Sequence, residues 1–141
     1  MSQLPNELRN LIESGPMAHL TTIEPDGSPQ VTVIWIGLDG EAIVSGHMHH
    51  HRKLKNIERD PRVALSFDAP RDHGVFMNPY AVLHARATVE RSDAAWDLLN
   101  RLVKTYMSPD AEFPAPKGPG YIVRYETERI SGVGPWVAKR S

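Results

Sequence analysis

Short runs along the chain alternate hydrophobic and polar residues, a pattern typical of β-strands with one buried face. The run 30–36 (QVTVIWI) is rich in β-branched and aromatic residues, which favour strands. In the run 62–68, hydrophobic residues occupy every second position. Segments rich in Pro, Asp and Gly separate such runs and favour turns. The pattern predicts six strands, at 17–23, 30–36, 42–46, 62–68, 80–90 and 121–133.

The first three predicted strands follow one another closely, with turns at 24–29 and 37–41. We therefore expect them to form an antiparallel meander. Elsewhere in the chain, hydrophobic residues recur at helical spacing and predict three helices, at 5–13, 52–60 and 93–107. Mostly antiparallel strands with short helices between them predict a mainly β fold, a small six-stranded antiparallel barrel that is closed or nearly closed. The length of 141 residues fits a single domain over 1–141.

Composition narrows the function classes. The chain has no cysteine, which excludes disulfides and thiolate metal sites, and its formal net charge is −1, which disfavours a nucleic-acid partner. No hydrophobic run approaches the roughly 18–20 residues of a membrane span. The N-terminal segment MSQLPNELRN lacks the layout of a secretion signal. We expect a cytoplasmic protein with no membrane span.

The segment GHMHHHRKLKN (46–56) concentrates histidines and basic residues before the predicted helix 52–60. Acidic residues stabilise the N-terminus of a helix and basic residues its C-terminus. This helix has the opposite order, with basic residues first and acidic residues last: Arg52, Lys53, Lys55, then Glu58 and Asp60. An anion such as a phosphate at the N-terminus would reverse the unfavourable effect.

The same helix pattern predicts which side chains are accessible. Leu54 and Ile57 should be buried, while Arg52, Lys53 and Asn56 should remain accessible to an anion. A solvated basic turn without a ligand explains the charges about equally well.

A metal site is the less favoured interpretation of this segment. His47 and His49 would share a strand face at about 7 Å spacing. However, the segment 46–56 contains no acidic residue, and its basic side chains would repel a cation. Neutral histidines also serve as simple N–H donors.

The order of these motifs resembles a known family. The run DGSPQVTVIWI…GEAIVSG…HRKLKNIERDPRVALSF is similar to the split β-barrel flavoproteins related to pyridoxamine 5′-phosphate oxidase. NPY (78–80) and SGVGPW (131–136) resemble the branch that uses the deazaflavin coenzyme F420. The chain departs from these relatives at 49–51, where they more often carry small residues or Arg.

The resemblance implies an FMN-binding-like split barrel that forms a homodimer, with a cofactor in each groove between subunits. The cofactor would be F420, or alternatively FMN. By this resemblance Arg52 and Lys53 would hold the cofactor phosphate, with Asn56 on the same helix face. The remaining cofactor-binding positions are Thr32, Val33, Ile34 and Trp35 along the ring, Ser45, Gly46 and His47 at the ribityl chain and ring edge, and Asn78, Tyr80 and Trp136 at the groove border, from the same or the partner subunit.

The resemblance implies an oxidoreductase that transfers a hydride from F420 to an unsaturated small-molecule substrate. Such chemistry needs no protein nucleophile, so no catalytic residue is assigned, and bound water, Tyr80 or His47 are candidate proton donors. Two alternatives keep the fold: an FMN-dependent oxidase or reductase, and a non-catalytic binder of flavin, haem or another tetrapyrrole. The proline-rich loop 108–120 is a candidate lid.

Overall fold

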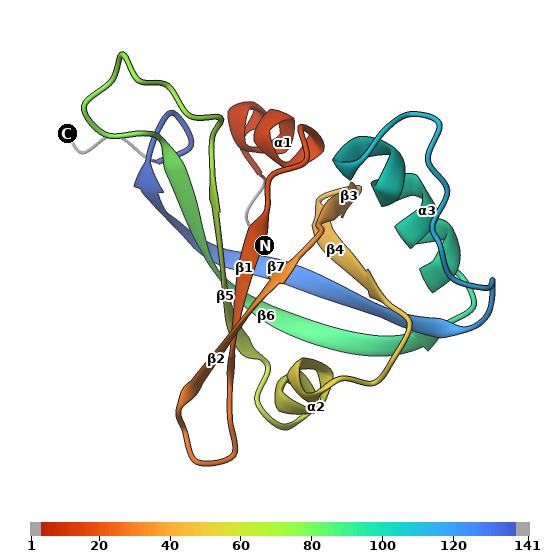
Figure 1. The fold of residues 1–141 in the computed structure, drawn as a ribbon. Helices are drawn as coiled ribbons and strands as arrows, with labels where there is room; N and C mark the ends of the chain where they lie inside the picture. Colours follow the sequence, from red (N-terminus) through yellow and green to blue (C-terminus); the bar gives the residue numbers. More distant parts are fainter. Residues whose placement is uncertain (1–3, 138–141) are drawn as a thin grey trace.

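The computed structural model describes residues 4–137. Its strands form one antiparallel sheet of seven strands in the order β2-β1-β5-β6-β7-β4-β3 (Figure 1). The elements in chain order are α1 (Asn6–Glu13), β1 (Ala18–Ile23), β2 (Pro29–Ile34), β3 (Gly37–Asp39), β4 (Ala42–His47), α2 (Arg52–Arg59), β5 (Arg62–Asp68), β6 (Tyr80–Ser92), α3 (Ala95–Tyr106) and β7 (Gly120–Val133).

The mainly β fold is confirmed, but the predicted number of strands is wrong. The residues Gly37–Asp39, predicted to be part of a turn, form the short strand β3 and pair with β4 around a turn at Gly40. The sheet also does not close, because β2 and β3 lie at its two edges. A strand of three residues has no hydrophobic period of its own, so only its pairing identifies it.

The predicted meander is wrong as well. β2 pairs with β1, as expected, but β4 pairs with β7, with His47 opposite Tyr121. The chain leaves β2 at Ile34 and crosses to the other edge of the sheet. Hydrophobic patterns identify strands, whereas the choice of partner depends on long-range packing that no local pattern contains.

Two hydrophobic clusters stabilise the fold. In the larger one, α1 buries Leu8 and Ile12 against strand residues such as Leu65 and Phe67. In the smaller one, α3 packs against β4 and β7 through residues that include Leu98 and Leu102. Within residues 4–137, no helix is long and hydrophobic enough to cross a membrane.

Glycine allows α3 to lie close to β3 and β4. A Cβ atom added at Gly46 would lie 2.9 Å from Leu99 Cγ, and one added at Gly37 would lie 2.8 Å from Leu102 Cδ2. Both distances are shorter than real Cβ contacts, so a side chain at either position would force Leu99 or Leu102 to shift. α3 therefore lies beside the end of β4, close to the histidine-rich segment (Figure 1).

Candidate functional site

A pocket of about 290 Å³ lies between the edge strand β2 and the end of β4. β2 supplies one wall, and the end of β4 and α3 supply the other, with α2 at one side. Because the sheet does not close, the space between its ends stays accessible. The lining residues are Met17, Val33, Ile34, Trp35, Gly46, His47, Lys53, Leu99 and Phe113. We call this site the Lys53 pocket.

Lys53 places a positive charge in this pocket from the first turn of α2. Its side chain is partly buried, and Nζ donates a long hydrogen bond of 3.4 Å to Thr32 Oγ1. Within residues 4–137, Lys53 forms no ion pair. Burial lowers the pKa of this ammonium group, which shows that the fold makes its charge unfavourable. An anion bound here would compensate for that cost.

His47 faces the same pocket as a neutral side chain. It is 7% exposed, and its Nε2 is hydrogen-bonded to Ser45 Oγ at 2.8 Å. Burial, together with the positive charges of Lys53 and His51, lowers the pKa of His47 to about 3. Ser45 is in turn hydrogen-bonded to Tyr125 OH at 2.8 Å. His47 can therefore offer a hydrogen-bonding group without adding charge.

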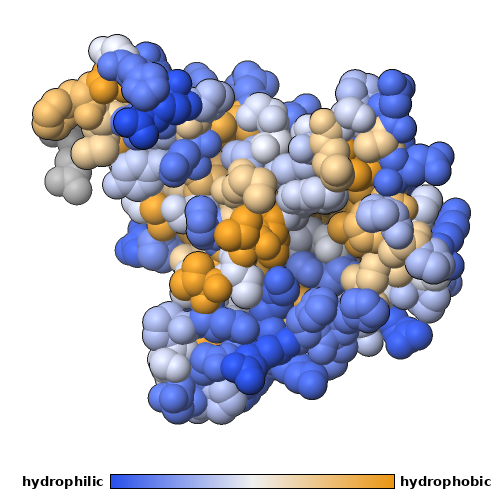
Figure 2. All heavy atoms as spheres, viewed as in Figure 1, coloured by the Kyte–Doolittle hydropathy of each residue, from blue (hydrophilic) through white to orange (hydrophobic). Residues whose placement is uncertain are grey.

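The wall formed by β2 is largely hydrophobic. Val33 is 50% exposed and Ile34 is buried. Hydrophobic side chains gather near the middle of the face shown in Figure 2, where β1 and β2 pass in Figure 1. The Trp35 ring stacks on Tyr106 of α3, with ring centroids 5.1 Å apart. One face of the Trp35 indole is thus already used in packing the chain against α3.

The structure contradicts the predicted accessibility of Asn56. Asn56 is 1% exposed, and its Nδ2 donates to Glu24 Oε1 at 2.7 Å and to Thr22 Oγ1 at 3.1 Å. Arg52 is exposed, as predicted, but its Nη1 lies 3.3 Å from Glu24 Oε2. The turn between β1 and β2 folds against α2, and its Glu24 carboxylate contacts both Asn56 and Arg52. The burial of Leu54 and Ile57 is confirmed.

The other histidines of the segment lie outside the pocket. His50 Nε2 is 2.7 Å from Glu58 Oε1, and the His50 ring stacks on Tyr121. His49 and His51 contact each other edge to face. Among the residues that the structure describes, no three His, Cys, Asp or Glu side chains are grouped so that they could hold a metal ion.

The remaining predicted site residues form a second group, which we call the Trp136 corner: Asn78, Tyr80 and Trp136. Trp136 is buried, and its Nε1 donates to the Tyr80 carbonyl at 3.0 Å. The Asn78 side chain donates to the Ala69 carbonyl and accepts from the Asp72 amide. These contacts shape the loop before β6 and the end of β7.

Within one chain, the Trp136 corner lies far from the His47 side of the Lys53 pocket. His47 pairs with Tyr121, which pairs with Arg91 near the end of β6. Tyr80 lies at the start of β6. The strand between Arg91 and Tyr80 is roughly 35 Å long at about 3.3 Å per residue. In Figure 1 the loop that leads into β6 is at the upper left, whereas α2 is at the bottom and α3 at the right. On the β2 side the separation is smaller, because Val33 pairs with His19, which pairs with Ser66, which pairs with Val82. None of the three corner residues lines the pocket, however.

Three lining residues were not predicted from the sequence: Met17, Leu99 and Phe113. Phe113 is held by its backbone N–H, which donates to Asn100 Oδ1 at 2.9 Å. The same loop accepts a hydrogen bond of 2.8 Å from Trp96 Nε1 at the Ala115 carbonyl. A single aromatic residue in an otherwise polar, proline-rich loop was the available signal for Phe113.

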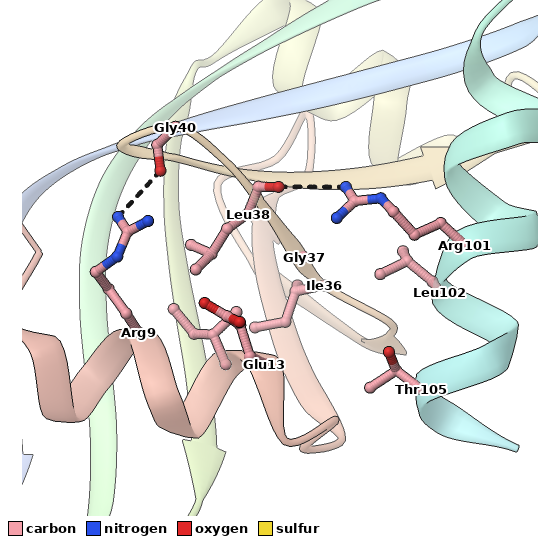
Figure 3. Close-up of a pocket in the computed structure, with 10 residues that line it drawn as sticks. Arg9, Glu13, Ile36, Gly37, Leu38, Gly40, Arg101, Leu102 and Thr105 are labelled. Carbon is pink, nitrogen blue, oxygen red and sulfur yellow. Dashed lines mark hydrogen bonds between the residues drawn. The ribbon is translucent and has the colours of Figure 1, made fainter. Parts of the chain in front are cut away.

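A second hollow of about 290 Å³ lies between α1, β3 and α3 (Figure 3). There Arg9 donates to the Gly40 carbonyl and Arg101 donates to the Leu38 carbonyl. None of the site residues predicted from the sequence lines it. Both guanidinium groups are used to hold β3 in place.

The family model of pyridoxamine 5′-phosphate oxidase matches residues 4–134. The chain belongs to this family. The resemblance to split β-barrel flavoproteins related to pyridoxamine 5′-phosphate oxidase is therefore confirmed. A search of curated protein sequences finds no match.

Solved structures agree with the family. An F420 reductase is 28% identical, with 91% of this chain and 98% of that chain covered and a TM-score of 0.74. A conserved hypothetical protein from Mycobacterium tuberculosis has the same TM-score at 21% identity, with 94% and 84% covered. HupZ from Group A Streptococcus is 14% identical, with 98% and 100% covered and a TM-score of 0.67. The latter two likenesses show the fold alone.

Proposed function

We propose that this member of the pyridoxamine 5′-phosphate oxidase family is an oxidoreductase that uses coenzyme F420. The observation that carries the proposal is Lys53, a partly buried cation beside a hydrophobic strand wall that forms no ion pair with any residue in 4–137. A cofactor with a flat ring and a phosphate needs this combination of apolar wall and positive charge. The similarity to an F420 reductase over nearly the whole chain supports the choice of the deazaflavin.

The residues of the Lys53 pocket fit such a cofactor. Lys53 would hold the phosphate, Thr32 would help to orient the lysine, and Val33 and Ile34 would contact the ring. Gly46 and His47 would border it from β4. When bound, the reduced deazaflavin supplies a hydride to an unsaturated small molecule. The protein's own contribution is to bind, orient and exclude water.

Four predicted residues take modified roles in this proposal. Ser45 is fully buried and would act through His47 rather than touch the cofactor. Asn56 would act indirectly, by fixing Glu24 and the turn between β1 and β2. Arg52 could reach a phosphate only by leaving Glu24, so Lys53 is the principal phosphate ligand. Trp35 would position the β2 wall through its stack on Tyr106.

We further propose that a second copy of the chain completes the site. None of the three residues of the Trp136 corner lines the Lys53 pocket of its own chain. A symmetric dimer could bring the Trp136 corner of one chain to the Lys53 pocket of the other, because two-fold symmetry creates two equivalent grooves. Asn78, Tyr80 and Trp136 would then border the groove from the partner.

Fluorescence titration tests the proposed cofactor. Purified protein should bind oxidised F420 with micromolar or tighter affinity and bind FMN more weakly. In a separate assay with reduced F420, the protein should consume the reduced coenzyme when a panel of enones and quinones is added. Preference for FMN would instead favour the flavin-dependent oxidase or reductase. Binding without turnover of any acceptor would favour a non-catalytic binder, and failure to bind either cofactor would contradict the proposal.

A further inference from the structure

A chain of three buried polar side chains ends at the Lys53 pocket. Tyr125 OH and Ser45 Oγ are 2.8 Å apart, and Ser45 Oγ and His47 Nε2 are also 2.8 Å apart. Tyr125 is 1% exposed and Ser45 is fully buried, so water does not reach their hydroxyl groups. These residues come from adjacent strands, β4 and β7, which fixes their spacing through the strand pairing.

The hydrogens of this chain can be arranged in only one fully satisfied way. Tyr125 OH has no hydrogen-bond partner other than Ser45 among residues 4–137. If Ser45 donated to Tyr125, the phenolic hydrogen would be buried without an acceptor, which is costly. Tyr125 therefore donates to Ser45, and Ser45 donates to His47 Nε2. Burial raises the pKa of Tyr125, so the phenol keeps the proton that this direction requires.

The direction of the chain fixes the tautomer of His47. A neutral imidazole carries one N–H, and a nitrogen that accepts a hydrogen bond cannot be the protonated one. With Nε2 as the acceptor, the hydrogen is on Nδ1. Nδ1 has no protein partner among the described residues, and His47 lines the pocket. The positive charges of Lys53 and His51, which face His47 from α2 and the segment before it, disfavour a second proton on the ring.

We propose that Tyr125, acting through Ser45, is a positioning residue that makes His47 present an Nδ1–H donor to an acceptor oxygen on the ring of the bound cofactor. The identity of the ligand rests on the proposed function, whereas the tautomer does not. Lys53 would bind the phosphate of the ligand, and His47 would donate a hydrogen bond to its ring. Each end of the ligand would thus be recognised by a different residue.

Nuclear magnetic resonance of ¹⁵N-histidine-labelled protein without cofactor tests the tautomer. At pH 7 the signals of His47, assigned by their loss in His47→Gln, should be those of the Nδ1–H form. In Tyr125→Phe, Ser45 can either donate to or accept from His47, so a mixture of the two tautomers is expected. Tyr121→Phe, which removes a hydroxyl from the same strand away from Ser45, should leave the wild-type signals. An Nε2–H form in the wild-type protein would overturn the proposal.

Affinity measurements separate this role from a merely structural one. Tyr125→Phe should weaken binding of the intact cofactor and of its phosphate-free ribityl core by the same factor, about two- to tenfold. Lys53→Met should weaken the intact cofactor much more than the core. An unchanged tautomer and affinity in Tyr125→Phe would contradict the proposal. If no deazaflavin or flavin binds but the Nδ1–H form is found, the proposed function fails while the positioning by Tyr125 stands.

Discussion

The Lys53 pocket and the Trp136 corner are built from opposite kinds of contact. In the Lys53 pocket, Lys53 makes a single long hydrogen bond, and Nδ1 of His47 has no partner among the described residues. In the Trp136 corner, by contrast, both the Trp136 N–H and the Asn78 amide are used in hydrogen bonds to the backbone. Unsatisfied groups point to a ligand, whereas satisfied groups stabilise the fold. The first region therefore leaves groups available to a ligand, whereas the second uses these hydrogen-bonding groups to hold a loop.

The largest expected effect concerns Lys53. Lys53→Met keeps the length of the side chain but removes its charge, so F420 affinity should fall tenfold or more, by about 1.5–3 kcal/mol. Fluorescence titration measures the change. Lys55→Met is the matched control, since Lys55 is exposed on the same helix and does not line the pocket. An equal loss in both variants would indicate a general charge effect rather than a site.

The second prediction uses the buried histidine of the Lys53 pocket. The pKa of His47 is about 3 in the folded chain, against an ordinary value of 6.5. The unfolded chain therefore binds a proton more readily as pH falls below about 6.5, and the folded state loses stability. Between pH 7 and pH 5 this amounts to about 2 kcal/mol. Urea unfolding at both pH values should show a smaller loss in His47→Gln than in the wild-type protein.

The third prediction concerns the support role of the Trp136 corner. Trp136→Phe removes the hydrogen bond to the Tyr80 carbonyl and should reduce the free energy of unfolding by about 1 kcal/mol. Urea unfolding measures it, and Trp96→Phe, which loses a similar bond in the loop 108–120, is the comparison. If Trp136→Phe left the free energy of unfolding unchanged, the support role of the Trp136 corner would be contradicted.

The smallest expected effect comes from mixing two variants, and it tests directly whether one groove combines residues of two chains. Lys53→Met and Tyr80→Ala chains, each of which should lose binding, are mixed in equal amounts, unfolded and refolded. If each groove combines one region from each chain, half of the dimers are mixed and about a quarter of all grooves are intact. A titration should then find tight sites in that proportion. No tight sites in the mixture would place both residues in one chain's groove, whereas tight binding by Tyr80→Ala alone would exclude a role for Tyr80.

Several features of the fold were predictable because they depend on local physics. The alternation of Val63, Leu65 and Phe67 identified β5, and the spacing of Leu54 and Ile57 correctly predicted the buried face of α2. Asn56 was predicted wrongly because its burial depends on the turn at Glu24, which folds against α2 from a distant part of the chain. A polar residue on a helix gives no local sign that a partner will cover it.

The candidate site also combines features that local sequence predicts with features that depend on distant contacts. The reversed order of charges in α2 was the basis of the anion hypothesis for Arg52 and Lys53. Lys53 forms no ion pair among the described residues, but Arg52 has a carboxylate partner that the pattern could not reveal. Phe113 and Leu99 enter the pocket only because α3 and its following loop pack against β4. Ser45 and Tyr125 are separated by most of the chain, and the pairing of β4 with β7 brings their hydroxyl groups together.

The sequence by itself determined six of the seven strands, the helices, the family motifs and the position of the basic helix start, because these depend on hydrophobic period and on neighbouring residues. The tertiary structure decided that the sheet stays open, which strands meet at the pocket and which polar groups are satisfied. Those properties arise from contacts between residues far apart in the chain, whose free energies of burial and hydrogen bonding act only once the strands have found their partners.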